Sequence, residues 1–497
     1  MSDIRVTYSG LIALAIGLSS VFTGMIFTLI VTRRLTAEEF GIWSIMGSMI
    51  SYFLIAEPVI SFWSTRQIAR GEKVGKTSIM TSFVFSFGTV PLYIALSFFV
   101  SNATHQNFYL MILGAVLLPV TFVSQTVTGI NLGHKPHANS YGLLAFESIK
   151  IPSGLFLVYF LDLGVNGAII TTLIAYIAKI FIQIYFAKTQ LRSKFVTTVL
   201  KRWLKLSWIP IYSNLAHVFS IIDIVAFSII TSSVKGVAYY SVSNTIAAVI
   251  ANAGLISQAI YPKLLAKGAH EHAAENFTRL MYFAIPLLGI TTIFSKPALF
   301  ALNPIYAEGS FIVVIISFRT FFYVLTSVLY QILMGIETID LEQNPRFANL
   351  AKSKIFFIPT LQNIQYFSHI VSVVITVIIL HSYDTPELEL VKWWAIIGFI
   401  LQIPFFIYAW ILVQKHVKFP FPSKSTLKYV GSTTVFTAVF FLSSGRIINY
   451  QHSIYDFLPR LILELSICVG IYILVTFMVD KKTRILLKAI FTEFTTK

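Results

Sequence analysis

Cysteine and acidic residues are scarce in this chain. Cys468 is the only cysteine, so no intramolecular disulfide can form. The sequence holds 21 Asp and Glu against 37 Lys and Arg, and only 12% of its residues are charged, while 56% are hydrophobic. A chain of 497 residues with a mean hydropathy of +0.78 has too much apolar surface for one soluble core. We therefore expect a polytopic membrane protein whose helices are partly solvated by lipid.

Catalytic and metal-binding signatures are also missing. The sequence has no G-x-S-x-G, no H-E-x-x-H, no Walker A motif and no Cys/His pair at metal-ligand spacing. No polar gap is long enough to fold as a soluble domain. We therefore expect no catalytic residue, no bound metal, no cofactor and no enzymatic activity. The first apolar stretch is too long for a signal-peptide core, so we expect it to stay in the mature protein.

The formal charge of +16 does not indicate nucleic acid as a partner. The basic residues form short clusters beside the ends of apolar stretches, where lipid headgroups and the insertion machinery account for them. We expect membrane lipids as partners and no nucleic acid.

Long apolar stretches dominate the chain. Cutting it at its polar gaps gives fourteen, near residues 10–31, 41–64, 78–100, 108–130, 140–160, 168–187, 207–231, 237–260, 280–301, 310–335, 355–381, 392–413, 429–444 and 459–479. Most are long enough to cross a bilayer as helices. The sequence therefore predicts an all-α protein with fourteen transmembrane helices.

The basic residues alternate between the two sides of the predicted membrane. Nearly all fall in every second gap, and the remaining gaps hold only Arg33, Arg34, Lys235, Lys392, Arg446 and Arg460. Because cytoplasmic loops are enriched in Lys and Arg, both termini are predicted to be cytoplasmic, in a multi-pass protein of the cell membrane.

A faint internal repeat divides the chain. With an offset of 197 residues, the polar turn and aromatic residue near Trp43 align with those near Tyr240, and the basic end at Arg66 aligns with Lys263. We interpret residues 1–205 as an N-terminal lobe and 206–428 as a C-terminal lobe of six spans each, related by a parallel repeat. Residues 429–497 then add two spans and a cytoplasmic tail. The alternative is that any two helical hairpins share aromatic and basic ends.

Ionisable residues inside the predicted spans are the main candidates for a functional site. They are Glu57, Glu147, Lys150, Lys179, Asp223, Lys296, Arg319 and Glu464. Each costs roughly 2.5–3.5 kcal/mol to place in a membrane, so each should face a cavity or a partner. Asn, Gln and His residues accompany them, including Gln125, Asn214, His217, Gln365 and His369, and structural bonds between helices are the simplest role for any one of these.

These ionisable residues differ in how readily a structural role explains them. Glu147 and Lys150 lie three residues apart on one helix face and can neutralise each other. Lys179 and Lys296 lie near span ends, where they could extend to the interface. Arg319 lies near mid-membrane, where a guanidinium needs an anion or water.

Two carboxylates complete the candidate site. Asp223 is as deep in its span as Arg319, so it is the expected partner of that arginine or else a proton or sodium site. Glu57 precedes Pro58, where a break in the helix would expose backbone carbonyls beside a carboxylate.

Four short motifs carry a resemblance to a known family. They read TRRLTAEEFGIWSI with WSTRQIARGE, then VKGVAYYSVSNTI after the span with Asp223, AIYPKLLAKG, and SKPALFALNPIYAEGS. In order and spacing they resemble the polysaccharide exporters, which are the lipid-linked oligosaccharide flippases of the multidrug/oligosaccharidyl-lipid/polysaccharide superfamily. The resemblance covers most of residues 10–335.

The resemblance implies fourteen spans in two lobes, alternating access, and a central cationic cavity for a pyrophosphate-bearing head and its sugars. Arg319, Lys150, Lys179 and Lys296 would bind the substrate, while Glu57, Asp223 and Glu147 would bind coupling ions or balance the cations. The expected partners are the lipid-linked glycan and glycosyltransferases of the same pathway, and the expected state is a monomer. Related peptidoglycan-precursor flippases carry arginines within their first two spans, and this chain has none there.

Two other functions remain open. An ion-coupled multidrug antiporter of the same superfamily would favour twelve spans and an acidic cavity. A membrane glycan polymerase or glycosyltransferase would favour a long external loop with paired carboxylates, and only Asp384, Glu387 and Glu389 in a short external segment fit that pattern.

Overall fold

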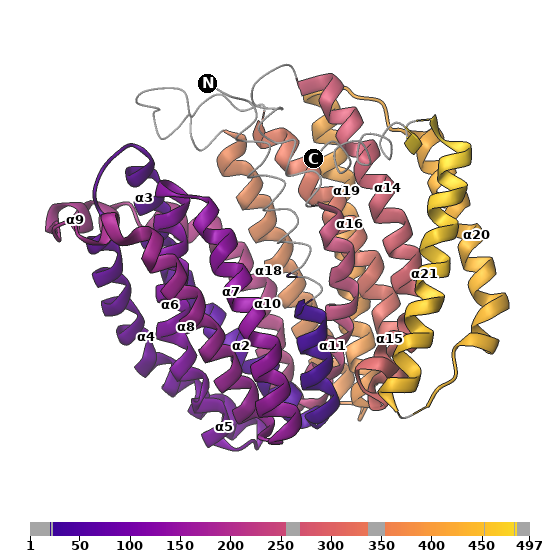
Figure 1. Ribbon diagram of the computed structural model, residues 1–497, viewed down its shortest axis with the longest axis horizontal. Coiled ribbons are helices and arrows are strands. Elements are labelled where there is room, and N and C mark those ends of the chain that lie inside the picture. The colour runs from indigo at the N-terminus through magenta and orange to yellow at the C-terminus, as the bar shows by residue number, and fades with distance from the viewer. Residues whose placement is uncertain are drawn as a thin grey trace. The chain divides into compact units, whose positions relative to one another are not determined.

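The computed structural model describes residues 20, 23–254, 269–335, 353–451, 453–481 and 483–484. The described residues form helices joined by short turns, with no β-strand among them (Figure 1). The motif AIYPKLLAKG lies outside these residues.

The first half of the chain contains α2 to α10. Their bounds are α2 Ala37–Phe53, η1 Leu54–Ala56, α3 Pro58–Ala69, α4 Gly75–Thr104, α5 Phe108–Ile112, α6 Gly114–His134, α7 His137–Gly154, η2 Leu155–Phe160, α8 Gly164–Leu191, α9 Thr197–Lys205 and α10 Trp208–Thr231.

The second half contains α11 to α21. Their bounds are α11 Lys235–Ala247, η3 Ala248–Asn252, α14 Ala269–Ile293, α15 Ser295–Leu302, η4 Pro304–Gly309, α16 Ser310–Gly335, α18 Lys354–His381, α19 Glu387–His416, α20 Ser423–Ile447 and α21 Ile454–Val479.

Ten helices of the described chain are long and apolar enough to cross a membrane. The count becomes eleven if α14 and α15, which bend by 67° at Phe294, form one span. The apolar stretches 10–31 and 237–260 both extend into residues outside the description. The stretch 429–444 lies in α20, a helix of 25 residues that is not among the ten. The all-α, multi-span architecture is thus confirmed, and the number fourteen stays a prediction.

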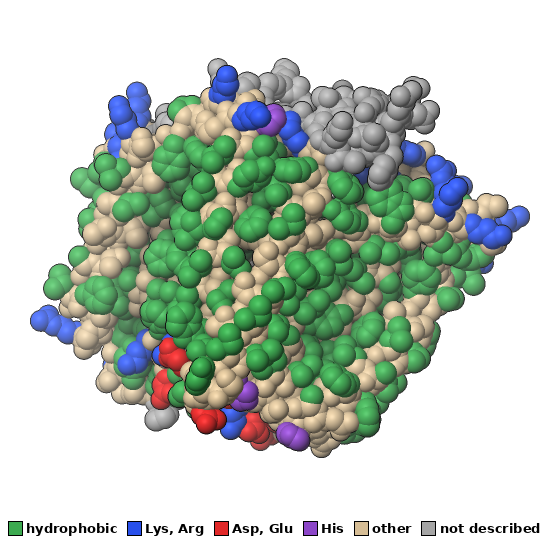
Figure 2. All heavy atoms as spheres, turned by 180° about the vertical axis from the view of Figure 1, so that it is seen from behind, with side chains coloured by type: hydrophobic (Ala, Val, Ile, Leu, Met, Phe, Trp, Pro, Cys, Tyr) green, Lys and Arg blue, Asp and Glu red, His purple; other side chains and the backbone are tan. Residues whose placement is uncertain are grey.

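The surface has the composition that lipid contact requires. Large apolar side chains are highly exposed on several helices, including Phe181 (71%), Tyr185 (73%) and Leu442 (79%). Apolar side chains cover most of the face in Figure 2, and charged side chains gather at its margins. Water would not solvate so large an apolar surface favourably, whereas acyl chains would. The chain is therefore a multi-pass membrane protein.

The chain divides into two compact units. One comprises Met1–Ser241 and Pro359–Trp394, and the other comprises Val242–Ile358 and Ala395–Lys497. We refer to them as the first and second units. The lobes expected from the order of spans, 1–205 and 206–428, are bounded differently from these units, and they stay a prediction.

Small residues let the helices of the first unit pack closely. A Cβ at Gly129 of α6 would lie 2.8 Å from the Ser61 Cβ of α3, and one at Gly133 would lie 2.5 Å from the Thr65 carbonyl oxygen. The Thr65 hydroxyl donates to the Gly129 carbonyl at 2.8 Å. Such close approach through glycine is the usual device of membrane helices, because dispersion contacts replace the hydrophobic effect between helices in lipid.

Polar bonds add to this packing. The Gln183 amide of α8 donates to Thr128 of α6 at 3.0 Å and to Asn139 of α7 at 3.1 Å. The Asn131 amide in turn donates to the Gln183 carbonyl at 2.9 Å. Three helices are thereby joined at one buried amide, as expected for polar residues within spans.

The order of elements recurs along the chain. A helix followed by a 3-10 turn occurs at α2 and η1 and again at α11 and η3. The short elements α5 and η4 each precede a long helix. Each follows an asparagine N-cap, Asn107 before α5 and Asn303 before η4, and the Asn side chain accepts a hydrogen bond from the backbone N–H two residues later. The parallel repeat of two six-span lobes stays a prediction.

In the second unit, Asp480 joins the end of α21 to the start of α20. Its carboxylate accepts from Lys428 at 3.1 Å, from Tyr429 at 3.2 Å and from the Thr483 backbone and hydroxyl at 3.1 and 3.0 Å. Burial alone would raise the pKa of Asp480, but the hydrogen bonds from Lys428, Thr483 and Tyr429 outweigh burial and lower it.

Asp480→Asn should destabilise the second unit. At neutral pH the loss should be about 1.5–3 kcal/mol, the range for a hydrogen bond to a charged group. Because the folded-state pKa of Asp480 is below its unfolded value, this contribution is present above the unfolded pKa and disappears as the pH falls through the folded pKa. Thermal unfolding of wild type and variant should therefore differ at pH 7 and converge in acid. Asp456→Asn, at the exposed other end of α21, is the control, and an equal loss in both variants would contradict this role.

Candidate functional site

A break between α2 and α3 places Glu57 beside a cavity. The helix tightens into the 3-10 turn η1 and restarts at Pro58, because proline is tolerated in the first turn of a helix and not in its interior. Glu57 stands at this junction and is only 4% exposed. The irregularity expected from the Glu-Pro sequence is therefore present.

Hydroxyl groups hold the Glu57 carboxyl group. Thr126 of α6 donates to Oε1 and Ser61 of α3 to Oε2, both at 2.9 Å. The Ser82 hydroxyl of α4 lies 3.0 Å from the Thr126 hydroxyl and extends the chain of polar groups. No described residue forms an ion pair with Glu57. A carboxyl group bound only by neutral hydroxyls can gain or lose a proton without breaking a salt bridge.

The cavity beside Glu57 has a volume of about 330 Å³. It lies wholly in the first unit, and most of its lining is polar: Ser51, Glu57, Ser61, Gln125, Asn214 and His217, with Leu54, Ile55, Pro58 and Val218. Its size is at the lower end of ligand pockets, and its lining can hydrogen-bond water or a polar ligand. Of the polar residues named from the sequence, Gln125, Asn214 and His217 meet at this cavity.

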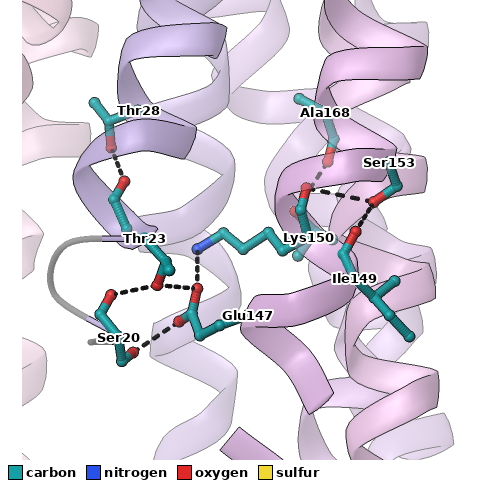
Figure 3. A network of polar contacts seen from close by, with 10 residues as sticks. Ser20, Thr23, Thr28, Glu147, Ile149, Lys150, Ser153 and Ala168 are labelled. Carbon is teal, nitrogen blue, oxygen red and sulfur yellow. Dashed lines mark hydrogen bonds and ion pairs between the residues drawn. The ribbon is translucent and has the colours of Figure 1, made fainter. Parts of the chain in front are cut away.

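Glu147 and Lys150 of α7 form a second polar group in the first unit. Their side chains approach to 3.9 Å, and the Glu147 carboxylate accepts from Ser20 at 2.7 Å and Thr23 at 2.8 Å (Figure 3). The Lys150 ammonium lies 4.8 Å from the Phe27 ring centre and 5.1 Å from that of Phe146. The neutralisation expected from their spacing is confirmed, and the aromatic rings add cation–π attraction.

Two adjoining cavities lie along α7. One, of about 360 Å³, is lined by Ser20, Thr23, Leu144, Glu147, Ser148, Ile151 and Pro152. The other, of about 480 Å³, is lined by Tyr141, Leu144, Ala145, Ser148, Ile182, Tyr185 and Phe186. They share Leu144 and Ser148, so an apolar, aromatic groove leads to the carboxylate of Glu147.

Asp223 of α10 lies in a buried cluster of the first unit. It is 1% exposed, and its Oδ2 accepts from the Trp394 indole at 2.8 Å. The His369 Nδ1 of α18 lies 3.7 Å from the same oxygen. The pairing of Asp223 with Arg319 joins residues of different units and stays a prediction.

The remaining cations differ in exposure. Lys179 of α8 is partly buried, with its ammonium 6.0 Å from the Tyr176 ring centre. Lys296 is exposed at the bend between α14 and α15, 5.7 Å from the Tyr450 ring centre. Lys296 lies at a helix end, as expected for a side chain that extends to an interface. Lys179 does not, because α8 runs from Gly164 to Leu191 and places it near the middle of the helix.

Arg319 of α16 lies against a glycine of α19. A Cβ built on Gly398 would be 2.9 Å from the Arg319 Nη1 and 3.1 Å from its Cδ. The glycine therefore provides the space that the guanidinium occupies.

Glu464 is fully buried between α20 and α21. The Ser443 hydroxyl lies 2.5 Å from Glu464 Oε1 and 2.8 Å from the Val439 carbonyl oxygen. The Ser443 hydroxyl of α20 therefore gives the buried Glu464 carboxyl group a polar partner on the neighbouring helix.

Some residues that bond the buried carboxylates could not be identified from the sequence. Trp394, Thr126 and Ser20 reach the three carboxylates from other helices, and nothing in their local sequence distinguishes them from other polar or aromatic residues of spans. Among the described residues, no group of three His, Cys, Asp or Glu could hold a metal ion.

Comparison with known proteins shows the fold. No protein-family model matches the chain, and no curated protein does. Among solved structures, the chain is similar to the lipid II flippase MurJ in an inward closed conformation, with a TM-score of 0.67 and 14% sequence identity. The match covers 95% of this chain and 99% of the MurJ chain. A multidrug resistance MATE family transporter of the MOP superfamily, facing inward, has a TM-score of 0.58 and 14% identity over 82% of this chain and 98% of its own.

A third structure with this fold is a MOP superfamily transporter from Pyrococcus furiosus, described as having a binding pocket of reversed polarity. It has a TM-score of 0.51 and 12% identity over 83% of this chain and 95% of its own. The chain thus has the fold of the membrane transporters of the MOP superfamily.

Proposed function

We propose that this protein is a flippase that moves a lipid-linked oligosaccharide from the cytoplasmic to the outer leaflet by alternating access. The observation that carries the proposal is the extent of the structural likeness to MurJ, which covers 95% of this chain. The likeness to the multidrug transporter covers 82%. A flippase fold that accommodates nearly the whole chain supports a lipid-linked substrate over a small drug.

Charge also supports an anionic headgroup as the substrate. Four cations, Lys150, Lys179, Lys296 and Arg319, lie in predicted spans, and a pyrophosphate offers them strong charge-assisted hydrogen bonds. Arg319 and Lys150 are proposed to attract the phosphates, with Lys179 and Lys296 as further cations of the substrate path. Both termini are proposed to be cytoplasmic in the cell membrane.

The groove along α7 would suit the apolar part of such a substrate. Its aromatic lining at Tyr141, Tyr185 and Phe186 is open to lipid, and it leads to the polar pair of Glu147 and Lys150. An amphiphile could keep its chain in the groove while its head meets the charged side chains.

The alternative functions have less support. An antiporter of cationic drugs would need an acidic cavity, and the polar cavity of the first unit holds one carboxyl group, Glu57. For a glycan polymerase, two of the three acidic residues named above have structural partners: Glu387 accepts from the Gly236 backbone at 2.6 Å, and Glu389 pairs with Lys392 at 2.7 Å.

Arg319→Ala should reduce flipping of a lipid-linked oligosaccharide by roughly 100-fold, because two charge-assisted hydrogen bonds at about 1.5 kcal/mol each would be lost. The measurement is the accessibility of labelled substrate to an external glycosidase in vesicles that contain the full-length protein. Gly398→Ala, which displaces the guanidinium without removing its charge, should also reduce the rate. Arg279→Ala is the control, since Arg279 pairs with Glu275 on the same helix. Unchanged flipping in Arg319→Ala would refute its role.

Lys150→Ala should lower both stability and flipping, because it leaves the Glu147 carboxylate buried without its cation. Adding Glu147→Gln should recover the thermal stability of the protein, since the remaining amide can still bond Ser20 and Thr23. Flipping should stay low in the double variant if Lys150 binds substrate. Recovery of both properties together would limit the pair to a structural role.

Glu57→Gln should slow flipping about tenfold or more and remove its dependence on an imposed proton gradient, because an amide cannot exchange a proton at this position. Flipping with and without the gradient should be compared in the same vesicles. Glu72→Gln, an exposed residue just after α3, serves as the control. A gradient effect that persists in Glu57→Gln would exclude Glu57 from coupling.

A further inference from the structure

The short helix α9 lies between two membrane-spanning helices of the first unit. α8 ends at Leu191 and α10 begins at Trp208, and both are long and apolar enough to cross a membrane. Residues 192–207, which include α9, must therefore lie close to the membrane surface. Figure 1 shows α9 beside α3 at one end of this unit.

One face of α9 is anchored in the core of the first unit. Trp203 is 1% exposed, and its indole donates to Gln67 Oε1 of α3 at 2.9 Å. The Trp203 ring belongs to a buried apolar cluster with Ile68, and Val199, one helical turn earlier, packs against that cluster. The position of α9 is therefore set by tertiary contacts and not only by its connection to the spans.

The turn between α3 and α4 lies next to the segment that leads into α9. The Val196 backbone donates to the Thr77 hydroxyl at 3.0 Å, and the Lys76 backbone donates to the Ser193 hydroxyl at 3.2 Å. These contacts bring residues 70–76 and 188–205 together at one end of the unit.

The two segments carry nine cations, all of them exposed. We refer to them as the α9 surface, and they are Arg70, Lys73, Lys76, Lys188, Arg192, Lys194, Lys201, Arg202 and Lys205.

The charge of the α9 surface is not balanced within the first unit. No described residue forms an ion pair with any of the nine cations, and Glu72 is the only acidic residue in the two segments. The cations repel one another, and a bound anion would relieve that repulsion. The orientation of a membrane protein requires cations on one side, but it does not require a helix anchored by a buried tryptophan.

Apolar side chains border these cations. The helical period puts Lys201 and Lys205 on one face of α9 and Leu204 on the adjacent face. Leu204 is 45% exposed, and Phe195, just before the helix, is 39% exposed. Exposed apolar side chains beside lysines are typical of a helix that lies in the membrane interface.

We propose that the α9 surface is a binding site for an anionic phospholipid. The phosphate meets the cations of α9, and the acyl chain packs on Leu204 and Phe195. A soluble anion would use the cations and leave the apolar side chains exposed, whereas a phospholipid satisfies both. The inference concerns lipid binding alone and does not rest on the proposed function.

The experiment is a lipid titration of the full-length protein in detergent, followed by native mass spectrometry. The two probes are dioleoylphosphatidylglycerol, which is anionic, and dioleoylphosphatidylcholine, which has the same chains and no net charge. We expect the wild type to bind the first phosphatidylglycerol at least tenfold more tightly than phosphatidylcholine. Glycerol phosphate should not compete at the same concentrations, because it has no chain to pack on Leu204.

Two triple variants that remove the same charge test the location of the site. Lys201→Gln with Arg202→Gln and Lys205→Gln should weaken phosphatidylglycerol binding roughly 100-fold, about fivefold for each cation, and leave phosphatidylcholine unchanged. Lys415→Gln with Lys418→Gln and Lys424→Gln is the matched control, because these exposed lysines lie in the second unit. Thermal unfolding in detergent checks the fold of each variant, and Lys201→Gln alone should still show the fivefold loss.

Three results would overturn the proposal. One is equal affinity of the wild type for the two lipids. Another is an equal loss in both triple variants, because binding would then follow net charge and not this surface. The third is competition by glycerol phosphate, which would indicate a site for small anions. No oligosaccharide substrate is present, so these results are independent of whether the protein flips lipids.

Discussion

Every polar or charged side chain on a lipid-solvated helix needs a partner inside the protein, and this requirement organises the structure. Glu57 is bound by the hydroxyls of Thr126 and Ser61, and Glu147 by Ser20 and Thr23. Gln183 joins α6, α7 and α8 through its amide. Water cannot satisfy these groups in a bilayer core, so the helices that carry their partners must lie beside them.

Two of the ionisable candidates lie at irregular points in the helices. Glu57 lies where α2 ends in a 3-10 turn before Pro58, and α14 and α15 meet at a bend of 67° next to Lys296. A broken helix leaves backbone groups without helical partners, which polar side chains or water can satisfy. The cavity beside Glu57 lies at such a break and is lined mainly by polar side chains.

Three buried carboxyl groups differ in the partners that surround them. Glu147 is balanced by Lys150, and Glu464 accepts a hydrogen bond from Ser443 of α20. Asp223 is held by N–H donors and lies next to an imidazole. Buried carboxyl groups in this protein therefore have different kinds of partner: an ammonium, a hydroxyl, and a set of N–H groups.

The sequence by itself determined that the chain is an all-α membrane protein, because hydropathy and the spacing of apolar stretches depend only on local composition. It also determined the Glu147–Lys150 pair and the break at Pro58, since both involve near neighbours on one helix. Only the tertiary structure decided that Trp394 and His369 meet Asp223 and that Thr126 reaches Glu57, because these residues are far apart in the chain. Their contacts follow from how helices pack in lipid, where small residues and polar partners set the neighbours and hydropathy does not distinguish one apolar helix from another.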